Sequence, residues 1–454
     1  MRKLIAIVAV LLAPSLAAQD FNAQVDKIAS DILAKTGAPS ASLAIVRDGK
    51  LVYANAYGTA NLDTKMRATP QMRYSIGSIS KQFTASAILM LVEEGKMSVD
   101  DKLVRWFPEL TRANEVSVRQ LLSMTSGYED FWPQDYVMPP MLQSVTAHEI
   151  IDAWGRKPLD FEPGTRWQYS NTNYVIAGAI VEKIAGMNVY DMLQRRVFGP
   201  LQMTTVFNTD VSPLEPTDAA RYLRYAMGPL RPAPKEGRGW MYAAGELAMT
   251  ASDLAKWDIS MIEQTVLKPH SYAEMETEVL LNNGAGTNYG LGVNVSRENT
   301  RRRISHGGEV SGFTATNVVY PDDRVAIVVE TNLDATDASS QIAAKIAELI
   351  FTPPSTPEVQ QAKSIFTGLQ KGQIDRALFT PNANAYFSDQ ALRDFASSLG
   401  PLGAPKTFTL MRQGLRGGMA QRNYVVTFAN GKKAGITTFI MPDGKIEQFM
   451  VAAD

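Results

Sequence analysis

One serine of the chain stands where it could act as a nucleophile. Ser78-Ile79-Ser80-Lys81 is the only Ser-x-x-Lys sequence present, and it opens an apolar segment that runs to Glu93. Three residues apart on a helix, Ser78 and Lys81 lie on one face. A serine hydroxyl needs a neighbour that takes its proton, and a desolvated lysine can do so because its pKa falls. At a helix start, the backbone N–H of Ser78 is also free to bind an oxyanion. The alternative is a helix-start serine followed by a solvated lysine.

A tyrosine and an asparagine form a second candidate group. Tyr169-Ser170-Asn171 lies in a predicted loop after Gly164. A tyrosine near ammonium groups can ionise to a phenolate and act as a general base. The amide of Asn171 could hydrogen-bond a substrate. Taken alone, the same residues are also typical of an ordinary loop.

A histidine followed by two glycines forms the third group. His306-Gly307-Gly308 is expected to precede a strand. Glycines let a substrate approach the backbone closely, and a strand there could pair with an extended acyl substrate. The alternative is a turn histidine before a strand.

Composition excludes several other kinds of protein. The chain has 454 residues, a formal net charge of -1, 45% hydrophobic and 20% charged residues. These values are ordinary for a folded globular protein, and 45 basic against 46 acidic residues leave no excess to neutralise nucleic acid. The chain has no cysteine, which excludes disulfides, thiolate metal sites and a cysteine nucleophile. It has only three histidines, so we expect no multi-histidine metal site.

The first 18 residues have the pattern of a secretory signal peptide. Arg2 and Lys3 precede an apolar stretch, Leu4 to Ala13, which is too short to span a bilayer comfortably. Small residues around Ala17 offer a cleavage site. The sequence predicts export, periplasmic or secreted, without a membrane anchor; the alternative is a buried N-terminal helix.

Both ends of the segment 19–352 contribute to one predicted α/β unit. The expected elements are helices over 21–36, 83–93 and 338–351, strands over 42–46, 51–53, 291–295, 313–320 and 325–331, and an Asp-Gly turn joining the first two strands. A helical lobe, about 111–249, is inserted between them. This layout predicts a discontinuous two-lobed domain with a groove between its lobes, where ligand sites tend to form.

A second, smaller domain follows a proline-rich linker. Residues 353–357 (Pro-Pro-Ser-Thr-Pro) predict the linker, and 358–454 predict an α+β domain. Its expected elements are helices over 358–371 and 389–399 and strands over 407–412, 422–428, 435–441 and 445–451.

The three groups, in this order and spacing, resemble the serine β-lactamase-related and penicillin-binding-protein-like hydrolases. The similarity is to the branch with class C β-lactamases, D-alanyl-D-alanine carboxypeptidases, D-aminopeptidases and family VIII carboxylesterases, over about residues 22–352. Stretches that carry it are 73–78, 121–127, 161–164, 243–247, 289–292 and 306–313. The resemblance implies an α/β (α+β) β-lactamase/transpeptidase-like fold: an antiparallel sheet flanked by helices plus a mostly helical lobe. The C-terminal domain resembles the nuclear transport factor 2-like fold more weakly.

The resemblance also implies roles for individual residues and no cofactor. Ser78 would be the nucleophile that forms an acyl-enzyme, while Lys81 and Tyr169 share the proton transfers in an order that the sequence leaves open. Asn171 and the segment His306 to Gly308 would bind substrate. The backbone N–H groups of Ser78 and Glu309 would form the oxyanion hole.

The histidine at 306 sets the expected substrate class. Many relatives carry lysine there, whose permanent charge can hold a substrate carboxylate, whereas histidine is largely neutral at pH 7. We therefore expect an exported hydrolase of peptide, amide or ester bonds in small molecules or peptides, D-peptidase-like or esterase-like. The alternatives are a true β-lactamase and a binding protein that is acylated by β-lactams or peptidoglycan fragments without turnover. The sequence leaves the oligomeric state open.

Overall fold

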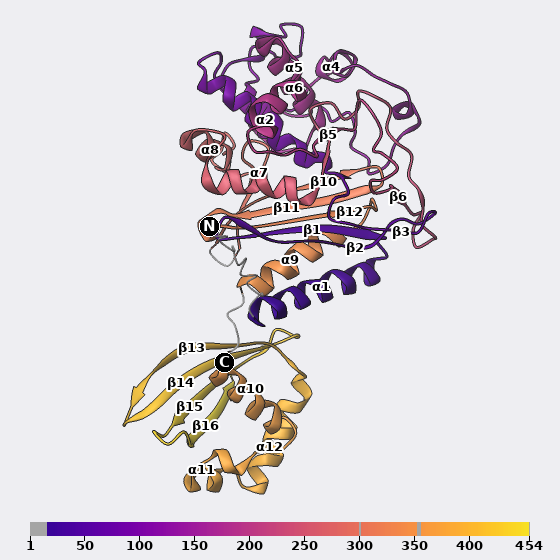
Figure 1. The fold of residues 1–454 in the computed structure, drawn as a ribbon. Helices are drawn as coiled ribbons and strands as arrows, with labels where there is room; N and C mark the ends of the chain where they lie inside the picture. Colours follow the sequence, from indigo (N-terminus) through magenta and orange to yellow (C-terminus); the bar gives the residue numbers. More distant parts are fainter. Residues whose placement is uncertain (1–15, 299–300, 352–355, 454) are drawn as a thin grey trace, which may run out of the picture. The chain divides into compact units, whose positions relative to one another are not determined.

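The computed structural model describes residues 16–298, 301–351 and 356–453. The chain divides into two compact units, one ending at Phe351 and the other beginning at Thr352 (Figure 1). Most of the predicted signal peptide, 1–18, lies outside the described residues, and so does the predicted linker before residue 356. Among the described helices, none has the length and apolar character needed to cross a membrane.

A seven-stranded antiparallel sheet forms the centre of the first unit. Its strand order is β3-β2-β1-β12-β11-β10-β9. The strands are β1 (Ser40–Arg47), β2 (Lys50–Asn61), β3 (Met66–Arg67), β9 (Asn294–Glu298), β10 (Arg301–Val310), β11 (Phe313–Tyr320) and β12 (Val325–Thr331). Asp48 and Gly49 turn the β1–β2 hairpin with φ of 53° and 72°, as the Asp-Gly signal predicted. Because β1 pairs with β12, the sheet joins both ends of the unit, as expected.

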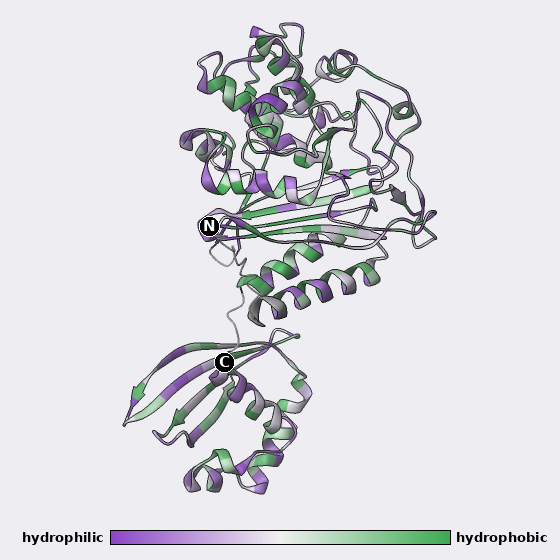
Figure 2. Cartoon of the chain, in the orientation of Figure 1, coloured by the Kyte–Doolittle hydropathy of each residue, from purple (hydrophilic) through white to green (hydrophobic). Residues whose placement is uncertain are grey.

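Helices cover both faces of this sheet. α1 (Leu16–Thr36) and α9 (Ala338–Phe351) lie on one face, and α2 (Ser80–Glu93) and α7 (Ala251–Glu263) lie on the other (Figure 1). Every residue of β12 is buried, and the hydrophobic run Val325 to Val329 takes up most of the strand (Figure 2). On this face α7 packs directly on the strands, and α2 is connected to them by the hydrogen bond from Gln82 Nε2 to Asn317 Oδ1 on β11.

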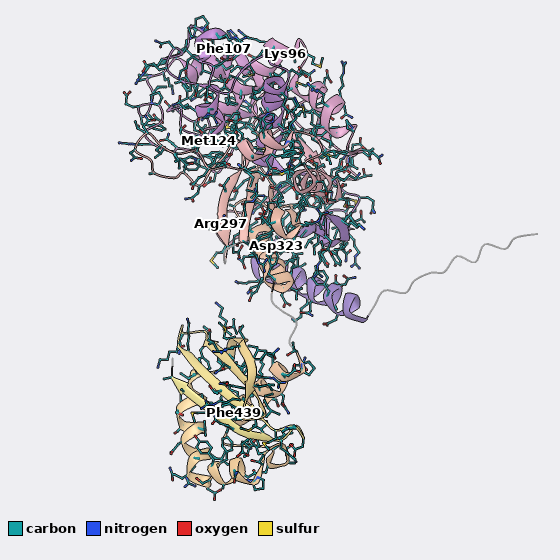
Figure 3. All side chains as sticks on the ribbon, turned by 90° about the vertical axis from the view of Figure 1, so that its left-hand side faces the viewer. Lys96, Phe107, Met124, Arg297, Asp323 and Phe439 are labelled. Carbon is teal, nitrogen blue, oxygen red and sulfur yellow. The ribbon has the colours of Figure 1, made fainter. Side chains whose placement is uncertain are left out.

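A helical lobe stands on the α2 side of the sheet. Its helices are α3 (Val118–Leu122), α4 (Ala147–Gly155), α5 (Asn171–Ala185) and α6 (Val189–Leu193), with α8 (Pro269–Met275) beside them. The connections contain five short strands, β4 (Tyr74–Ser75), β5 (Phe207–Asn208), β6 (Tyr222–Leu223), β7 (Arg231–Pro232) and β8 (Leu247–Met249). In Figure 3, Phe107 marks this lobe, Arg297 marks the sheet, and Met124 lies between them. α2 packs against α5 and is buried from Ser80 to Leu91. Polar groups on this helix are therefore removed from water.

Two predictions for the sheet were wrong in detail. The strand expected at 291–295 is β9, which begins at Asn294. His306-Gly307-Gly308 does not precede a strand but lies inside β10. The sequence did not indicate this strand, because Arg301 to Arg303 and the two glycines lack the alternation of apolar and polar residues that predicts one.

The second unit is an antiparallel sheet with helices on one face. The strand order is β13-β14-β15-β16, formed by Pro405–Arg416, Met419–Phe428, Lys433–Ile440 and Ile446–Ala453. The helices are α10 (Pro357–Leu369), α11 (Pro381–Tyr386) and α12 (Asp389–Leu399), of which α11 was not predicted. Phe366 and Phe449 belong to its own apolar core, while Phe439 stands on the sheet (Figure 3).

Candidate active site

Ser78 lies in a tight turn that leads directly into α2. The turn, Gly77–Ile79, is a 3-10 helix, and Ser78 is half-buried in it. Gly77 has φ +51°, and a Cβ there would lie 2.8 Å from the backbone nitrogen of Glu309. Glycine at 77 therefore lets the turn press against β10, which brings the two predicted oxyanion-hole residues, Ser78 and Glu309, to one place.

β10 approaches this turn at a second glycine. A Cβ on Gly308 would lie 1.8 Å from the carbonyl oxygen of Ile76, so no larger residue fits there. Gly307 and Glu309 are exposed on the same strand, and the Glu309 carboxylate accepts a hydrogen bond from the backbone N–H of Ala335. The strand thus presents exposed backbone next to the Ser78 turn.

Lys81 is fully buried one helical turn from Ser78. Its Nζ lies 2.9 Å from Ser78 Oγ, 2.7 Å from Asn171 Oδ1 and 2.8 Å from the carbonyl oxygen of Ala244. Burial lowers the pKa of Lys81 from an ordinary value of 10.5 to about 7, although the nearby Asp130 carboxylate acts in the other direction. The solvated lysine considered as the alternative is therefore wrong: a large part of Lys81 is a neutral amine at pH 7.

Ala244 holds Lys81 through its backbone. Ala243, directly before it, has φ +50°, a conformation that is rare for residues with a Cβ. The carbonyl of Ala243 accepts from Thr84 Oγ1 at 2.7 Å, and that of Ala244 accepts from Lys81. The turn therefore aims two successive carbonyls at α2.

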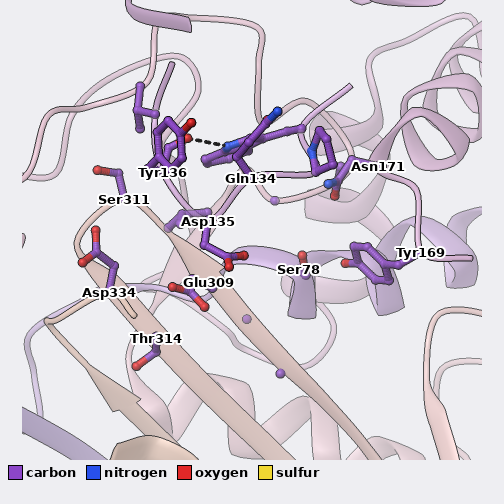
Figure 4. A pocket seen from close by; sticks show the side chains of 18 of the residues that line it. Ser78, Gln134, Asp135, Tyr136, Tyr169, Asn171, Glu309, Ser311, Thr314 and Asp334 are labelled. Atoms are coloured by element: carbon purple, nitrogen blue, oxygen red, sulfur yellow. Dashed lines mark hydrogen bonds between the residues drawn. The ribbon is translucent and has the colours of Figure 1, made fainter. Parts of the chain in front are cut away.

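Tyr169 faces the same serine from the other lobe. The Lys81 Nζ lies 5.0 Å from the centre of the Tyr169 ring, and Figure 4 shows the Tyr169 hydroxyl pointing toward Ser78. Burial raises the pKa of Tyr169, and the Ser78 hydroxyl offsets this only in part. The environment thus favours the phenol, whereas the sequence had suggested a phenolate.

Asn171, the first residue of α5, connects Lys81 to a carboxylate that sequence reasoning missed. Asp130 is 8% exposed and accepts from Asn171 N at 2.9 Å, from Asn171 Nδ2 at 3.2 Å and from Trp132 N at 3.1 Å. Burial raises the pKa of Asp130, while these N–H groups and Lys81 oppose the shift. The signal in the sequence was weak: an acidic residue three positions after Gly127, just beyond the stretch 121–127 that carried the resemblance.

His306 is buried, and both of its ring nitrogens are engaged. Nδ1 lies 2.5 Å from the carbonyl oxygen of Gly307, and Nε2 lies 2.8 Å from the hydroxyl of Tyr289. Since a carbonyl only accepts, Nδ1 carries the proton and Nε2 accepts from Tyr289. Burial, with a smaller effect of Lys81, lowers the pKa of His306 to about 4. The histidine is therefore neutral at pH 7.

A pocket of about 990 Å³ opens above these residues. Every predicted site residue lines it except Lys81, which is buried. The loop from Glu129 to Val137 forms part of its wall (Figure 4). The described lining contains no lysine or arginine, and its carboxylates are those of Glu129, Asp130, Asp135, Asp160, Glu309 and Asp334.

A serine paired with a buried lysine of lowered pKa beside an open pocket defines a class of acyl-transfer enzymes. The sequence matches the β-lactamase family over residues 25–350, and the chain belongs to that family. It is a serine hydrolase, and the predicted β-lactamase/transpeptidase-like fold is confirmed.

Several relatives have names that indicate activity. The chain is 27% identical over 374 residues to penicillin-binding protein 4* of Bacillus subtilis (strain 168), covering 78% of this chain and 82% of that protein. It is 26% identical over 334 residues to a D-aminopeptidase of Brucella anthropi, covering 71% of this chain but only 61% of that protein. The solved D-amino acid amidase of Ochrobactrum anthropi SV3, complexed with D-phenylalanine, superposes with a TM-score of 0.66 and 26% identity, covering 73% of this chain and 99% of that chain. The family match ends at residue 350, so the resemblance of the C-terminal domain to the nuclear transport factor 2-like fold stays a prediction.

Proposed function

We propose that the chain hydrolyses peptide, amide or ester bonds through an acyl-Ser78 intermediate, as a D-peptidase-like or esterase-like enzyme. The observation that carries this proposal is the environment of Lys81. Asn171 Oδ1 and the Ala244 carbonyl only accept hydrogen bonds, so they take both N–H groups of a neutral amine. The lone pair of Lys81 then faces the Ser78 hydroxyl at 2.9 Å. Lys81 is accordingly the base that takes the Ser78 proton.

The remaining steps use groups around the same serine. As Ser78 Oγ bonds to the substrate carbonyl carbon, its proton passes to Lys81, and the carbonyl oxygen becomes an oxyanion held by the N–H groups of Ser78 and Glu309. Tyr169, a phenol, gives its proton to the leaving group as the scissile bond breaks, and the Lys81 ammonium restores that proton. Water then attacks the acyl-enzyme with the proton transfers reversed, which returns Ser78 to its hydroxyl form.

The charge of the pocket favours substrates without a carboxylate. His306 is neutral, and the described lining carries carboxylates but no lysine or arginine. Glu309 keeps access to solvent, but desolvation by the surrounding protein raises the pKa of its carboxyl, and the charges of Asp135 and Asp334 raise it further. A neutral or amine-bearing amide or ester is therefore preferred to a carboxylate-bearing β-lactam, which weighs against a true β-lactamase. The relatives named D-aminopeptidase and D-amino acid amidase support this choice.

The proposal includes export and a two-domain chain. The pattern of residues 1–18 supports secretion or a periplasmic location after cleavage. The hydrolase domain is proposed to span 19–352 with its helical lobe at about 111–249, followed by the linker 353–357 and the small domain 358–454.

Turnover of p-nitrophenyl butyrate by the mature protein and by Ser78→Ala tests the proposal. We expect the variant to fall to the uncatalysed rate, at least ~10³-fold below the parent. Ser397→Ala, an exposed serine of the second unit, is the control and should leave the rate unchanged. D-phenylalanine amide and a chromogenic cephalosporin then rank the substrate classes. Turnover that persists in Ser78→Ala contradicts the proposal, and acylation of Ser78 without turnover supports the binding-protein alternative.

A further inference from the structure

Asp130 touches neither the serine nor the lysine, yet its contacts determine how they meet. We infer that Asp130 is a positioning residue of the proposed reaction, which fixes the Asn171 amide so that its oxygen faces Lys81. This inference rests on the proposed function, because it concerns the proton that Lys81 takes from Ser78.

The first step is the orientation of the amide. A side-chain amide has two orientations that differ only in exchanging its NH₂ and its oxygen. The Asp130 carboxylate can only accept hydrogen bonds, and Asn171 Nδ2 lies 3.2 and 3.3 Å from its two oxygens. The NH₂ end therefore faces Asp130, and the oxygen end lies 2.7 Å from Lys81 Nζ.

The second step is the effect on Lys81. With the Asn171 oxygen and the Ala244 carbonyl occupying the two N–H groups of the neutral amine, the lone pair is left for Ser78. With the amide reversed, its NH₂ would donate to that lone pair and compete with the Ser78 hydroxyl. Asp130 does not contact Lys81, but by fixing the Asn171 amide it determines whether the lone pair of Lys81 faces Ser78.

The third step is the charge that Lys81 experiences. The rings of Tyr169 and Tyr174 lie 5.0 and 5.6 Å from its Nζ, His306 on β10 is neutral, and Ser78, Asn171 and Ala244 present uncharged groups. The Asp130 carboxylate is the negative charge that favours protonated Lys81, against the larger effect of burial. Removing this charge lowers the pKa of Lys81, so the fall of kcat on the acid side of the pH profile should move to lower pH.

Asp130 also has a structural role that the experiment must separate. Its carboxylate accepts from the backbone N–H of Asn171, the first residue of α5, where a negative charge complements the helix dipole. A purely structural role would lower stability and activity together. It would neither move the pH profile nor depend on the Asn171 side chain.

The test compares Asp130→Asn, Asp130→Glu, Asn171→Ala and the double variant Asp130→Asn/Asn171→Ala by kcat and KM for p-nitrophenyl butyrate from pH 5 to 10. We expect Asp130→Asn to lower the plateau kcat by at least ~10-fold with KM within about twofold, and to shift the acid limb to lower pH. Asp130→Glu, which keeps the charge, should recover part of kcat and keep the limb in place. In the Asn171→Ala background, Asp130→Asn should lower kcat by less than about twofold, because the two side chains act as one unit.

Three results would overturn the inference: Asp130→Asn within about twofold of the parent kcat, effects of Asp130 and Asn171 that multiply, or an unmoved acid limb. If circular dichroism shows that Asp130→Asn does not fold, Asp130→Glu alone is the test. This variant keeps the negative charge, so a shift in the acid limb of its pH profile contradicts the inference. Ser78→Ala is measured alongside. Turnover retained there contradicts the proposed function, whereas its loss combined with any of the three results contradicts only the role of Asp130.

Discussion

The acid limb of the pH profile distinguishes Lys81 from Tyr169 as the acylation base. Burial acts in opposite directions on the two groups, because it disfavours whichever form is charged. It lowers the pKa of Lys81 to about 7 and raises that of Tyr169 above its ordinary value of 10. The two candidate bases therefore become active in different ranges of pH.

The expected size of the effect follows from the fraction of neutral Lys81. With a pKa of about 7, this fraction falls about tenfold for each pH unit well below 7, which is roughly 1.4 kcal/mol per unit. We expect kcat/KM at pH 5 to be about 100-fold below the plateau, and kcat/KM at pH 9 to be only about twofold above its value at pH 7. If Tyr169 ionised to serve as the base, kcat/KM would instead rise about 100-fold between pH 7 and 9.

The assay is kcat/KM for p-nitrophenyl butyrate between pH 5 and 9. Ser78→Ala at each pH supplies the blank for spontaneous ester hydrolysis, and circular dichroism confirms that the protein is folded throughout. Lys81→Arg keeps a permanent charge and should lose activity at every pH. A profile that is flat from pH 5 to 9, or one that climbs about 100-fold from pH 7 to 9, refutes the assignment of Lys81.

Three further changes test other parts of the site and the core. His306→Lys should speed acylation by benzylpenicillin by about tenfold or more, since a hydrogen bond to a charged group is worth about 1.5–3 kcal/mol; an unchanged or slower rate argues against the reasoning on carboxylates. Tyr289→Phe leaves the buried Nε2 of His306 unpaired and should lower the free energy of unfolding in urea by about 1–3 kcal/mol, and no change would contradict the hydrogen bond between these two side chains. Glu330 is buried, and neither of its carboxyl oxygens has a hydrogen-bond partner, so burial raises its pKa well above the ordinary value of 4.5. When the pH rises above 4.5, the unfolded chain loses this proton while the folded chain keeps it, which lowers the free energy of unfolding. The melting temperature of Glu330→Gln relative to the parent should therefore increase from pH 5 to 8, and a constant difference would show that Glu330 is not held neutral.

Local sequence patterns predicted most elements of the fold because each carried its own signal. The hairpin at Asp48-Gly49 and helix α2 have short-range signals, a turn dipeptide and an apolar run ended by Gly95. β10 lacked such a signal, since its pairing with β11 and its contact with the Ser78 turn depend on residues far away in the chain. α11 has only six residues, too few for a periodic pattern.

For the site, the sequence indicated the side chains with distinctive chemistry but not their neighbours. Ser78, Lys81 and Tyr169 could be found because few arrangements of serine, lysine and tyrosine do acyl chemistry. The Ala244 carbonyl could not, because every residue has a carbonyl, and its direction depends on the unusual backbone of Ala243. Asp130 is likewise an ordinary loop aspartate until the fold brings it to Asn171.

The same desolvation that costs the protein stability makes this acid–base pair usable near neutral pH. In water, lysine is charged and tyrosine is neutral at pH 7, so lysine cannot accept a proton. Inside the site, about half of Lys81 is a neutral amine at pH 7 and Tyr169 remains a phenol, so one can accept the Ser78 proton while the other can supply a proton to the leaving group. A neutral histidine beside Lys81 adds no repulsion to its ammonium form, whereas a lysine at 306 would place a second ammonium near it. The histidine therefore fits a site in which burial alone lowers the pKa of Lys81 and no cation binds a substrate carboxylate, which is why the pH profile and the substrate preference should change together in His306→Lys.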